Sequence, residues 1–135
     1  MTTPSAPSTR VAHRWLLVVA LAVTVLVTAC GGGGDAGPTV TGEAKTGQDL
    51  WRSKGCVNCH TINGNRSEGP SWKGLYGSTV TLKDGTTVTA DDAYITQSIK
   101  DPNSQVVQGF SPLMPKTQMS DDEIKAVIAF IRALA

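Results

Sequence analysis

Apolar residues recur at helical spacing near the end of the chain. Ser120-Asp121-Asp122-Glu123 has the composition of a capping box, in which the serine and the glutamate satisfy each other's free backbone N–H groups. The apolar positions that follow share one face of a helix: Ile124, Val127, Ile128, Ile131 and Leu134. The pattern predicts a helix from Ser120 to the C-terminus.

A shorter helix is predicted from about Gly47 to Lys54. Thr46 is a candidate N-cap, and Gly55 is suited to ending the helix. Leu50 and Trp51 give this segment an apolar face.

Another helix is predicted after Thr89. Asp91 and Asp92 lie in its first turn, where negative charge is favourable, and Pro102 ends it. The apolar face of this helix consists of Tyr94, Ile95 and Ile99.

Between these two helices, residues 79–88 alternate β-branched and polar side chains around Asp84-Gly85. This pair favours a hairpin with a two-residue turn. The rest of the chain offers no strand to extend the hairpin, so we expect a small ribbon. The overall prediction is a mostly α protein with long loops.

The first 29 residues have the pattern of a targeting segment. Arg10, His13 and Arg14 form a basic region, and an apolar run spans residues 15–27. As a helix this run is about 20 Å long, short of the roughly 30 Å hydrocarbon core, so a retained membrane anchor is the weaker interpretation. We interpret residues 1–29 as a lipoprotein signal peptide.

Cys30 follows Val27-Thr28-Ala29, and the four residues together resemble the lipobox of bacterial lipoproteins. We therefore predict that Cys30 is lipidated and anchors the protein to a membrane; the alternative is an ordinary cleavage site with an incidental thiol. Residues 30–45, rich in glycine, are predicted to form a flexible tether, and residues 46–135 a single domain. Such a protein would be extracytoplasmic, in the periplasm or on the outer face of the cell membrane.

Charge and composition exclude some functions and leave others open. Without Arg10 and Arg14, ten Lys and Arg residues face eleven Asp and Glu residues, and no basic run suggests nucleic acid. Aromatic residues make up only 5% of the chain, a thin core that a bound apolar cofactor would complete. The cations Lys54, Arg66, Lys73 and Lys116 are either solvated surface or a docking ring for an acidic partner.

The strongest chemical signal is Cys56-Val57-Asn58-Cys59-His60. The C-x-x-C-H pattern is typical of covalent c-type haem attachment, in which Cys56 and Cys59 form two thioethers and His60 coordinates the iron. A zinc site would need about four ligands, and the two spare candidates, Cys30 and His13, lie in or beside the leader. A redox dithiol would require a βαβ context that the pattern lacks, and a Cys56–Cys59 disulfide would be strained.

A second axial ligand must come from elsewhere in the chain. The options are Met114, Met119, a lysine or an open site. Met119 directly precedes the Ser120 cap, where it can pack on Ile124 as a hydrophobic staple. Met114 lies between Pro112 and Pro115 in a loop without periodicity, so we favour Met114 as the ligand. A His/Met pair suits electron transfer rather than oxygen binding.

From Gly47 onward the chain resembles a class I cytochrome c, with one haem c. The matching residues are Gly47, Trp51, Cys56 to His60, Gly69-Pro70, Gly74 to Gly77, Met114-Pro115 and Ala129 to Ile131. It is similar to the cytochrome c domain fused to subunit II of some bacterial haem–copper oxidases, which has the counterparts of Asp84-Gly85-Thr86, Tyr94 and Asp101-Pro102-Asn103 in the same order. The transmembrane helices and copper module of that subunit have no counterpart here.

The resemblance implies a class I cytochrome c fold, with three main helices and a small β-hairpin wrapped around one haem. It implies that Gly47 and Trp51 meet Val127 and Phe130 where the first and last helices cross. It also implies that the Pro70 carbonyl accepts a hydrogen bond from the His60 ring. Finally, it suggests that Trp72 or Tyr76 donates to a haem propionate, with plain packing as the equal alternative.

These features favour an electron carrier over an enzyme. The predicted function is a membrane-tethered mono-haem cytochrome that carries single electrons between a quinol-oxidising complex and a terminal haem–copper oxidase. A fixed haem c subunit of a larger respiratory complex is the alternative. A haem peroxidase or gas sensor would need an open iron site and distal acid–base residues, which makes it the weakest interpretation.

Overall fold

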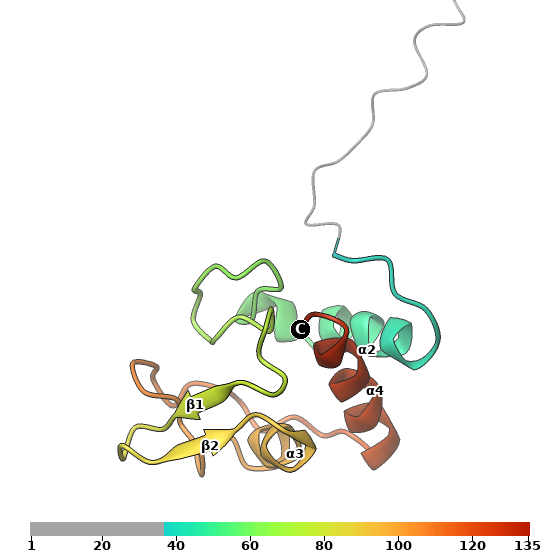
Figure 1. Cartoon of the computed structure of the whole chain (residues 1–135). Helices are drawn as coiled ribbons and strands as arrows, with labels where there is room; N and C mark the ends of the chain where they lie inside the picture. Colours follow the sequence, from blue (N-terminus) through green and yellow to red (C-terminus); the bar gives the residue numbers. More distant parts are fainter. Residues whose placement is uncertain (1–36) are drawn as a thin grey trace, which may run out of the picture. The chain divides into compact units, whose positions relative to one another are not determined.

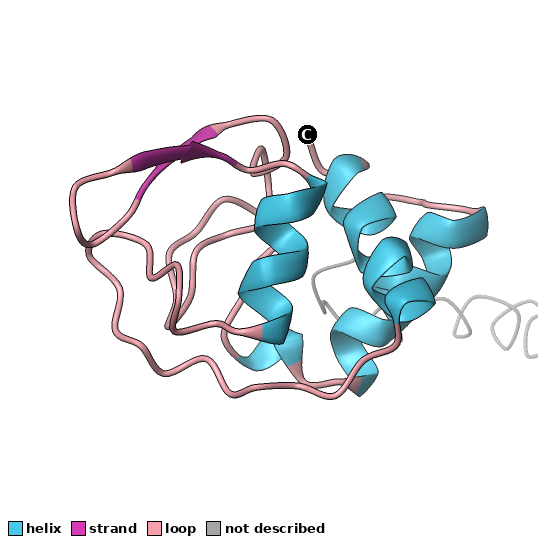
Figure 2. Ribbon diagram, turned by 90° about the horizontal axis from the view of Figure 1, so that it is seen from below, coloured by secondary structure: helices cyan, strands magenta, loops and turns pink. Residues whose placement is uncertain are grey.

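The computed structural model describes residues 37–135. The predicted signal peptide, Cys30 and the first part of the predicted tether lie outside the described residues. The elements in chain order are α2 (Gly42–Ser53), the 3₁₀ turn η1 (Cys56–Asn58), β1 (Thr79–Thr81), β2 (Thr87–Thr89), α3 (Asp92–Lys100) and α4 (Asp121–Arg132). Long loops join η1 to β1 and α3 to α4, whereas β2 leads almost directly into α3 (Figures 1 and 2). This is the mostly α arrangement, with three main helices and a small β-hairpin, that the sequence predicts.

The crossing of α2 and α4 is the most extensive helix contact of the described chain (Figure 1). Gly47 makes it possible, because a Cβ at this position would overlap the Ala126 carbonyl and lie 2.8 Å from the Phe130 Cβ. The Trp51 and Phe130 rings pack with their centroids 6.0 Å apart, and Val127 is buried beside them. The meeting of these residues, which the resemblance implied, is therefore present.

Helix α2 begins five residues earlier than predicted, at Gly42, and Thr41 rather than Thr46 is its N-cap. Two features support the additional turn: Glu43 lies in the first turn, and Lys45 forms an ion pair with Asp49 one turn later. Residues 42–45, which the sequence analysis placed in the tether, therefore belong to a helix of the domain. Gly42 and the flanking threonines, Thr41 and Thr46, concealed the helix.

Helix α4 has the predicted cap, whereas Asp91, which was expected in the first turn of α3, is instead its N-cap. The Asp91 side chain accepts a hydrogen bond from the Tyr94 N–H, so Asp91 is the N-cap of α3. Ser120 and Glu123 form both hydrogen bonds of the predicted capping box at the start of α4. Helix α4 ends at Arg132, three residues before Ala135, instead of reaching the C-terminus.

The predicted hairpin is present, but its turn differs. Strands β1 and β2 pair antiparallel with Val80 opposite Val88, and the Leu82 N–H donates to the Thr86 carbonyl. The loop therefore holds three residues, 83–85, instead of two. Gly85 adopts φ 88°, and the Asp84 carboxylate accepts from the Thr86 N–H, which fits a turn closed by a left-handed glycine.

A third segment joins the hairpin, although the rest of the sequence offers no strand pattern that would extend it. Leu82 forms an isolated bridge with Val107. The Lys83 N–H donates to the Val106 carbonyl at 2.8 Å, and the Gln108 N–H donates to the Thr81 carbonyl at 2.9 Å. These bonds attach the start of the loop between α3 and α4 to the hairpin. The local sequence around Val107 has no strand pattern because only two or three residues take part.

Candidate haem-binding site

The two cysteines and the histidine of the motif are gathered by one tight turn. Gly55, at φ 78°, ends α2 and reverses the chain, a conformation that suits glycine. The Cys59 and His60 N–H groups then both donate to the Cys56 carbonyl, at 3.1 and 2.9 Å. The turn places both thiols and the imidazole within one short segment, as attachment to a single porphyrin edge requires.

A hydrogen bond at Nδ1 orients the His60 ring. Its Nδ1 lies 2.8 Å from the Pro70 carbonyl oxygen, which can only accept, so Nδ1 carries the proton and Nε2 keeps a free lone pair. Burial lowers the pKa of His60, and the bond to Pro70 offsets part of this shift. The imidazole is therefore neutral at physiological pH, the form that binds a metal.

Gly69 allows the backbone to come this close to the ring. A Cβ on Gly69 would lie 2.6 Å from the His60 Cε1 and 2.8 Å from Nδ1. The Gly69 N–H donates to the Cys59 carbonyl and the Trp72 N–H donates to the Thr61 carbonyl, which ties the two arms of the loop together. The carbonyl of Pro70 is thus held by backbone bonds on both sides.

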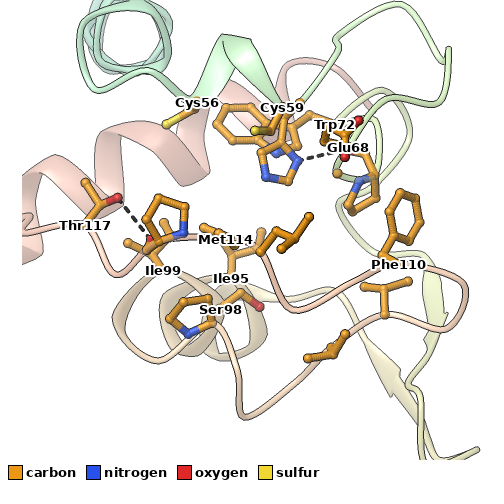
Figure 3. Close-up of a pocket in the computed structure, with 18 of the residues that line it drawn as sticks. Cys56, Cys59, Glu68, Trp72, Ile95, Ser98, Ile99, Phe110, Met114 and Thr117 are labelled. Atoms are coloured by element: carbon orange, nitrogen blue, oxygen red, sulfur yellow. Dashed lines mark hydrogen bonds between the residues drawn. The ribbon is translucent and has the colours of Figure 1, made fainter.

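The motif forms one wall of a cavity of about 360 Å³, within the range of roughly 300–1,000 Å³ for small-molecule sites. Figure 3 shows Cys56 and Cys59 on one side of this cavity and Ile95, Ser98 and Ile99 of α3 on the other. The residues of the predicted site that line the cavity are Cys56, Cys59, His60, Pro70, Trp72 and Met114.

The two candidate methionines differ in position. Met114 lines the cavity, between the cysteine wall and α3 (Figure 3), whereas Met119 packs against the core without lining the cavity. A thioether at Met114 therefore faces the same space as the two thiols and the imidazole. This placement favours Met114 over Met119 as a ligand.

Trp72 and Tyr76 also differ. Trp72 lines the cavity, and its ring lies 5.5 Å from the His60 ring between centroids. Tyr76 lies outside the cavity lining: its hydroxyl donates to the Asp92 carboxylate at 2.9 Å, and the Arg132 guanidinium stacks on its ring. Of the two suggested propionate donors, Trp72 therefore lies at the cavity, whereas the hydroxyl of Tyr76 is engaged by α3.

The apolar wall opposite the motif was not assigned to the site from the sequence. Ile95 and Ile99 are buried and line the cavity together with Tyr94, Phe110 and Ile131. The spacing of Ile95 and Ile99 predicts a buried helix face, and such a face is also typical of ordinary core. Two apolar residues four positions apart show that this face is buried, but they do not show whether protein or a cofactor covers it.

Two of the cations proposed for a docking ring are already engaged by the chain. Lys54 pairs with Glu123 at 2.8 Å. The Arg66 guanidinium donates to the Gly109 carbonyl and stacks on the Phe110 ring at 4.2 Å. The hydrogen bond with Lys54 is the main cause that holds the pKa of Glu123 below its ordinary value, and the bond with the Ser120 N–H adds to it.

The site fits a covalently held, largely apolar cofactor better than a metal ion alone. Both thiols are free of a disulfide, and within residues 37–135 no group of three or more His, Cys, Asp and Glu side chains is placed to hold an ion. The Gln105 side-chain oxygen is buried at the cavity without a partner in the described chain, where a polar edge of a ligand could satisfy it. Two thiols, a neutral imidazole and a thioether around an apolar space are the donor set of a c-type haem.

The fold and this donor set define a mono-haem c-type cytochrome. Residues 44–135 match the family model for cytochrome c, so the chain belongs to the cytochrome c family and carries one covalently bound haem c. Among solved structures, it is similar to cytochrome cH from Methylobacterium extorquens, with 25% identity and a TM-score of 0.51. That similarity covers 68% of this chain and 99% of the other. A comparison with curated proteins found no match.

Membership of the family makes the chain an electron carrier that exchanges electrons with redox partner proteins. In the described range 37–135, the helices are too short or too polar for any of them to cross a bilayer.

Proposed function

We propose that Cys56 and Cys59 attach the haem and that His60 and Met114 are its axial ligands. The observation that carries this proposal is the cavity that the cysteine turn and Met114 line together. When bound, the haem supplies a one-electron couple at its iron. The residues of the chain then determine how that couple is held and how accessible it is.

Each residue has a definite task in this arrangement. The Pro70 carbonyl holds the His60 proton on Nδ1 and so presents Nε2 as the donor. Ile95 and Ile99 keep water from the opposite side, which limits solvent reorganisation around the site. A thioether from Met114 is a soft donor that favours the reduced state and leaves no position open for oxygen.

Attachment and ligation can be tested separately. Acid–acetone extraction should leave the pigment on the protein, whereas extractable haem would contradict attachment through Cys56 and Cys59. Replacing either cysteine with serine should shift the reduced α-band, because one vinyl group regains conjugation. The reduced wild-type protein should not bind carbon monoxide; rapid binding would mean that the sixth position is open.

We further propose that the protein is anchored through a lipidated Cys30 and carries electrons in a respiratory chain, from a quinol-oxidising complex toward a haem–copper oxidase. The lipobox-like sequence and the similarity to oxidase-fused cytochrome domains support this assignment. The role in electron transfer is also supported by two exposed apolar side chains next to the cavity. Val57, which follows Cys56 in the chain, is 42% exposed, and Leu113, which precedes Met114, is 67% exposed. Exposed apolar groups of this kind suit a transient docking contact.

Mass spectrometry of the mature protein tests the anchor. It should detect an N-terminus at Cys30 with added acyl mass, and a start at Gly31 or an intact Met1 would refute the anchor. Purification after gentle solubilisation tests the mode of action. A free carrier should separate from the oxidase, whereas stable co-purification would favour a fixed subunit.

A further inference from the structure

The segment between α3 and α4 holds Met114 with few bonds of its own. Its start is attached to the hairpin through Val106 and Gln108, and its end is the Ser120 cap. Within the described chain, no backbone N–H of residues 114–119 donates to a backbone carbonyl. The two prolines beside Met114 restrict the backbone but cannot attach it to the rest of the fold.

Arg66 reaches this segment from the loop that follows His60. Its guanidinium centre lies 4.2 Å from the centroid of the Phe110 ring, within the range of a cation–π contact. The same guanidinium donates a hydrogen bond to the Gly109 carbonyl. Gly109 turns the chain at φ 82°, and a Cβ there would lie 3.7 Å from Nη1, so the guanidinium rests directly on the turn.

This contact joins the two sides of the site. Arg66 belongs to the loop that supplies Gly69 and Pro70 to the His60 ring, whereas Phe110 lines the cavity on the segment of Met114 (Figure 3). Of the hydrogen bonds between the described residues, the one from Arg66 to Gly109 is the only one that connects residues 61–75 with residues 101–119. The other end of the segment is held by a longer bond, 3.4 Å, from Lys54 Nζ to the Gln118 carbonyl.

We propose that Arg66 is a positioning residue for the sixth iron ligand. By clamping Phe110 and Gly109 it holds the Met114 segment closed against the histidine side, and so keeps the thioether at the iron. The inference rests on the proposed ligation by Met114. It requires no contact between Arg66 and the haem.

A charge-assisted hydrogen bond contributes free energy that corresponds to roughly a tenfold change in an equilibrium. Loss of the clamp should therefore raise the population with Met114 off the iron by on the order of tenfold. The global fold should change less, because Arg66 is exposed and the α2–α4 core lies elsewhere.

The test compares Arg66→Gln and Arg66→Lys with wild-type holoprotein. Three quantities are measured: the temperature at which the methionine–iron charge-transfer absorbance of the oxidised form disappears, the apparent affinity of the reduced form for carbon monoxide, and the midpoint of unfolding in guanidinium chloride. Arg66→Gln should lose the absorbance at lower temperature and bind carbon monoxide about tenfold more tightly. For Arg66→Lys, both values should lie between those of wild type and Arg66→Gln, since lysine retains the positive charge but lacks the planar guanidinium.

Arg52→Gln is the matched control. Arg52 also stacks on an aromatic ring, that of Trp51 at 5.3 Å, but this contact stays within α2. The control should behave like wild type in both ligand measurements. If Arg66→Gln does not fold, Phe110→Leu removes the stacking partner, retains apolar volume, and should move the same two ligand measurements in the same direction.

The outcomes separate this inference from the proposed function. Wild-type protein without the charge-transfer absorbance would refute ligation by Met114, and the clamp with it. Wild-type protein with the absorbance, and an Arg66→Gln variant that matches it in temperature and in carbon monoxide affinity, would overturn the clamp alone. Equal losses in Arg66→Gln and Arg52→Gln would also overturn it.

Discussion

The two sides of the haem cavity are built in different ways. On the histidine side, α2 and α4 cross in direct contact at Gly47, and the aromatic rings of Trp51, Trp72 and Phe130 pack with centroids 6.0–6.4 Å apart. On the methionine side, none of residues 101–119 is buried. Side-chain contacts and a few backbone bonds to the hairpin hold that segment in place.

This difference indicates which part of the site is preformed. The histidine side draws its stability from apolar burial and helix packing, which do not require the cofactor. The methionine side exposes its backbone and buries little, and such segments open locally at low cost in free energy. We therefore expect the attachment turn and the His60 ring to be rigid, and the Met114 segment to respond to small perturbations.

The helix crossing should show the largest effect. In Gly47→Ala, the added methyl would overlap the Ala126 carbonyl and approach the Phe130 Cβ to 2.8 Å. Alanine favours a helix over glycine by about 1 kcal/mol, yet we expect a net loss of roughly 2–3 kcal/mol in the free energy of unfolding because α2 and α4 must separate. Guanidinium denaturation measures the loss. Thr46→Ala on the exposed side of α2 is the control, and a more stable Gly47→Ala protein would contradict the close crossing.

The support of the His60 ring should be next in size. Gly69→Ala would place a methyl 2.6 Å from the His60 Cε1 and displace the ring from the Pro70 carbonyl. We expect a loss of about 1–2 kcal/mol in the free energy of unfolding together with a shifted reduction potential, which potentiometric titration detects. Ser67→Ala in the same loop should change neither. An unchanged potential in Gly69→Ala would mean that the ring orientation does not depend on this contact.

Replacing each of the two methionines in turn should distinguish iron ligation from a contribution to stability alone. Met119→Ala should cost about 1 kcal/mol in the free energy of unfolding, since its side chain is only partly buried, and Met114→Ala should cost at least as much because it also removes the proposed bond to iron. Only Met114→Ala should abolish the charge-transfer absorbance, lower the reduction potential and admit carbon monoxide to the reduced haem. Spectra of the two variants measure this directly, and the opposite pattern would assign the ligand to Met119.

The smallest effect concerns an ion pair distant from the cavity. Hydrogen bonds from Arg132 and Tyr76 hold the pKa of Asp92 below its ordinary value of 3.8. A carboxyl whose pKa is lower in the folded than in the unfolded state stabilises the fold at every pH above its unfolded-state pKa. This stabilisation is lost as the pH falls through the folded-state pKa. Asp92→Asn should therefore be less stable than wild type at pH 7, and the difference should shrink below about pH 4. A difference in stability between Asp92→Asn and wild type that stays constant as the pH falls would contradict the linkage.

Features that depend on neighbouring residues were predictable from the chain. The capping box at Ser120, the Asp91 cap region and the end of α2 at Gly55 all rest on interactions within a few residues. The cysteine motif is also local, because attachment to one porphyrin edge dictates the spacing of its thiols. The sequence by itself therefore determined the fold class, the cofactor and the place of the cysteine turn in the chain.

Features that depend on contacts between distant residues required the tertiary structure. Nothing near Tyr76 indicates that its hydroxyl is taken by Asp92, and nothing near Val107 indicates pairing with Leu82. The placement of Arg66 on Phe110 likewise follows from the packed fold. In each case the local sequence is compatible with several conformations, and the free energy of a long-range contact selects one of them. Tertiary packing thus decided which of two methionines faces the cavity, although both lie in the same loop and have the same chemistry.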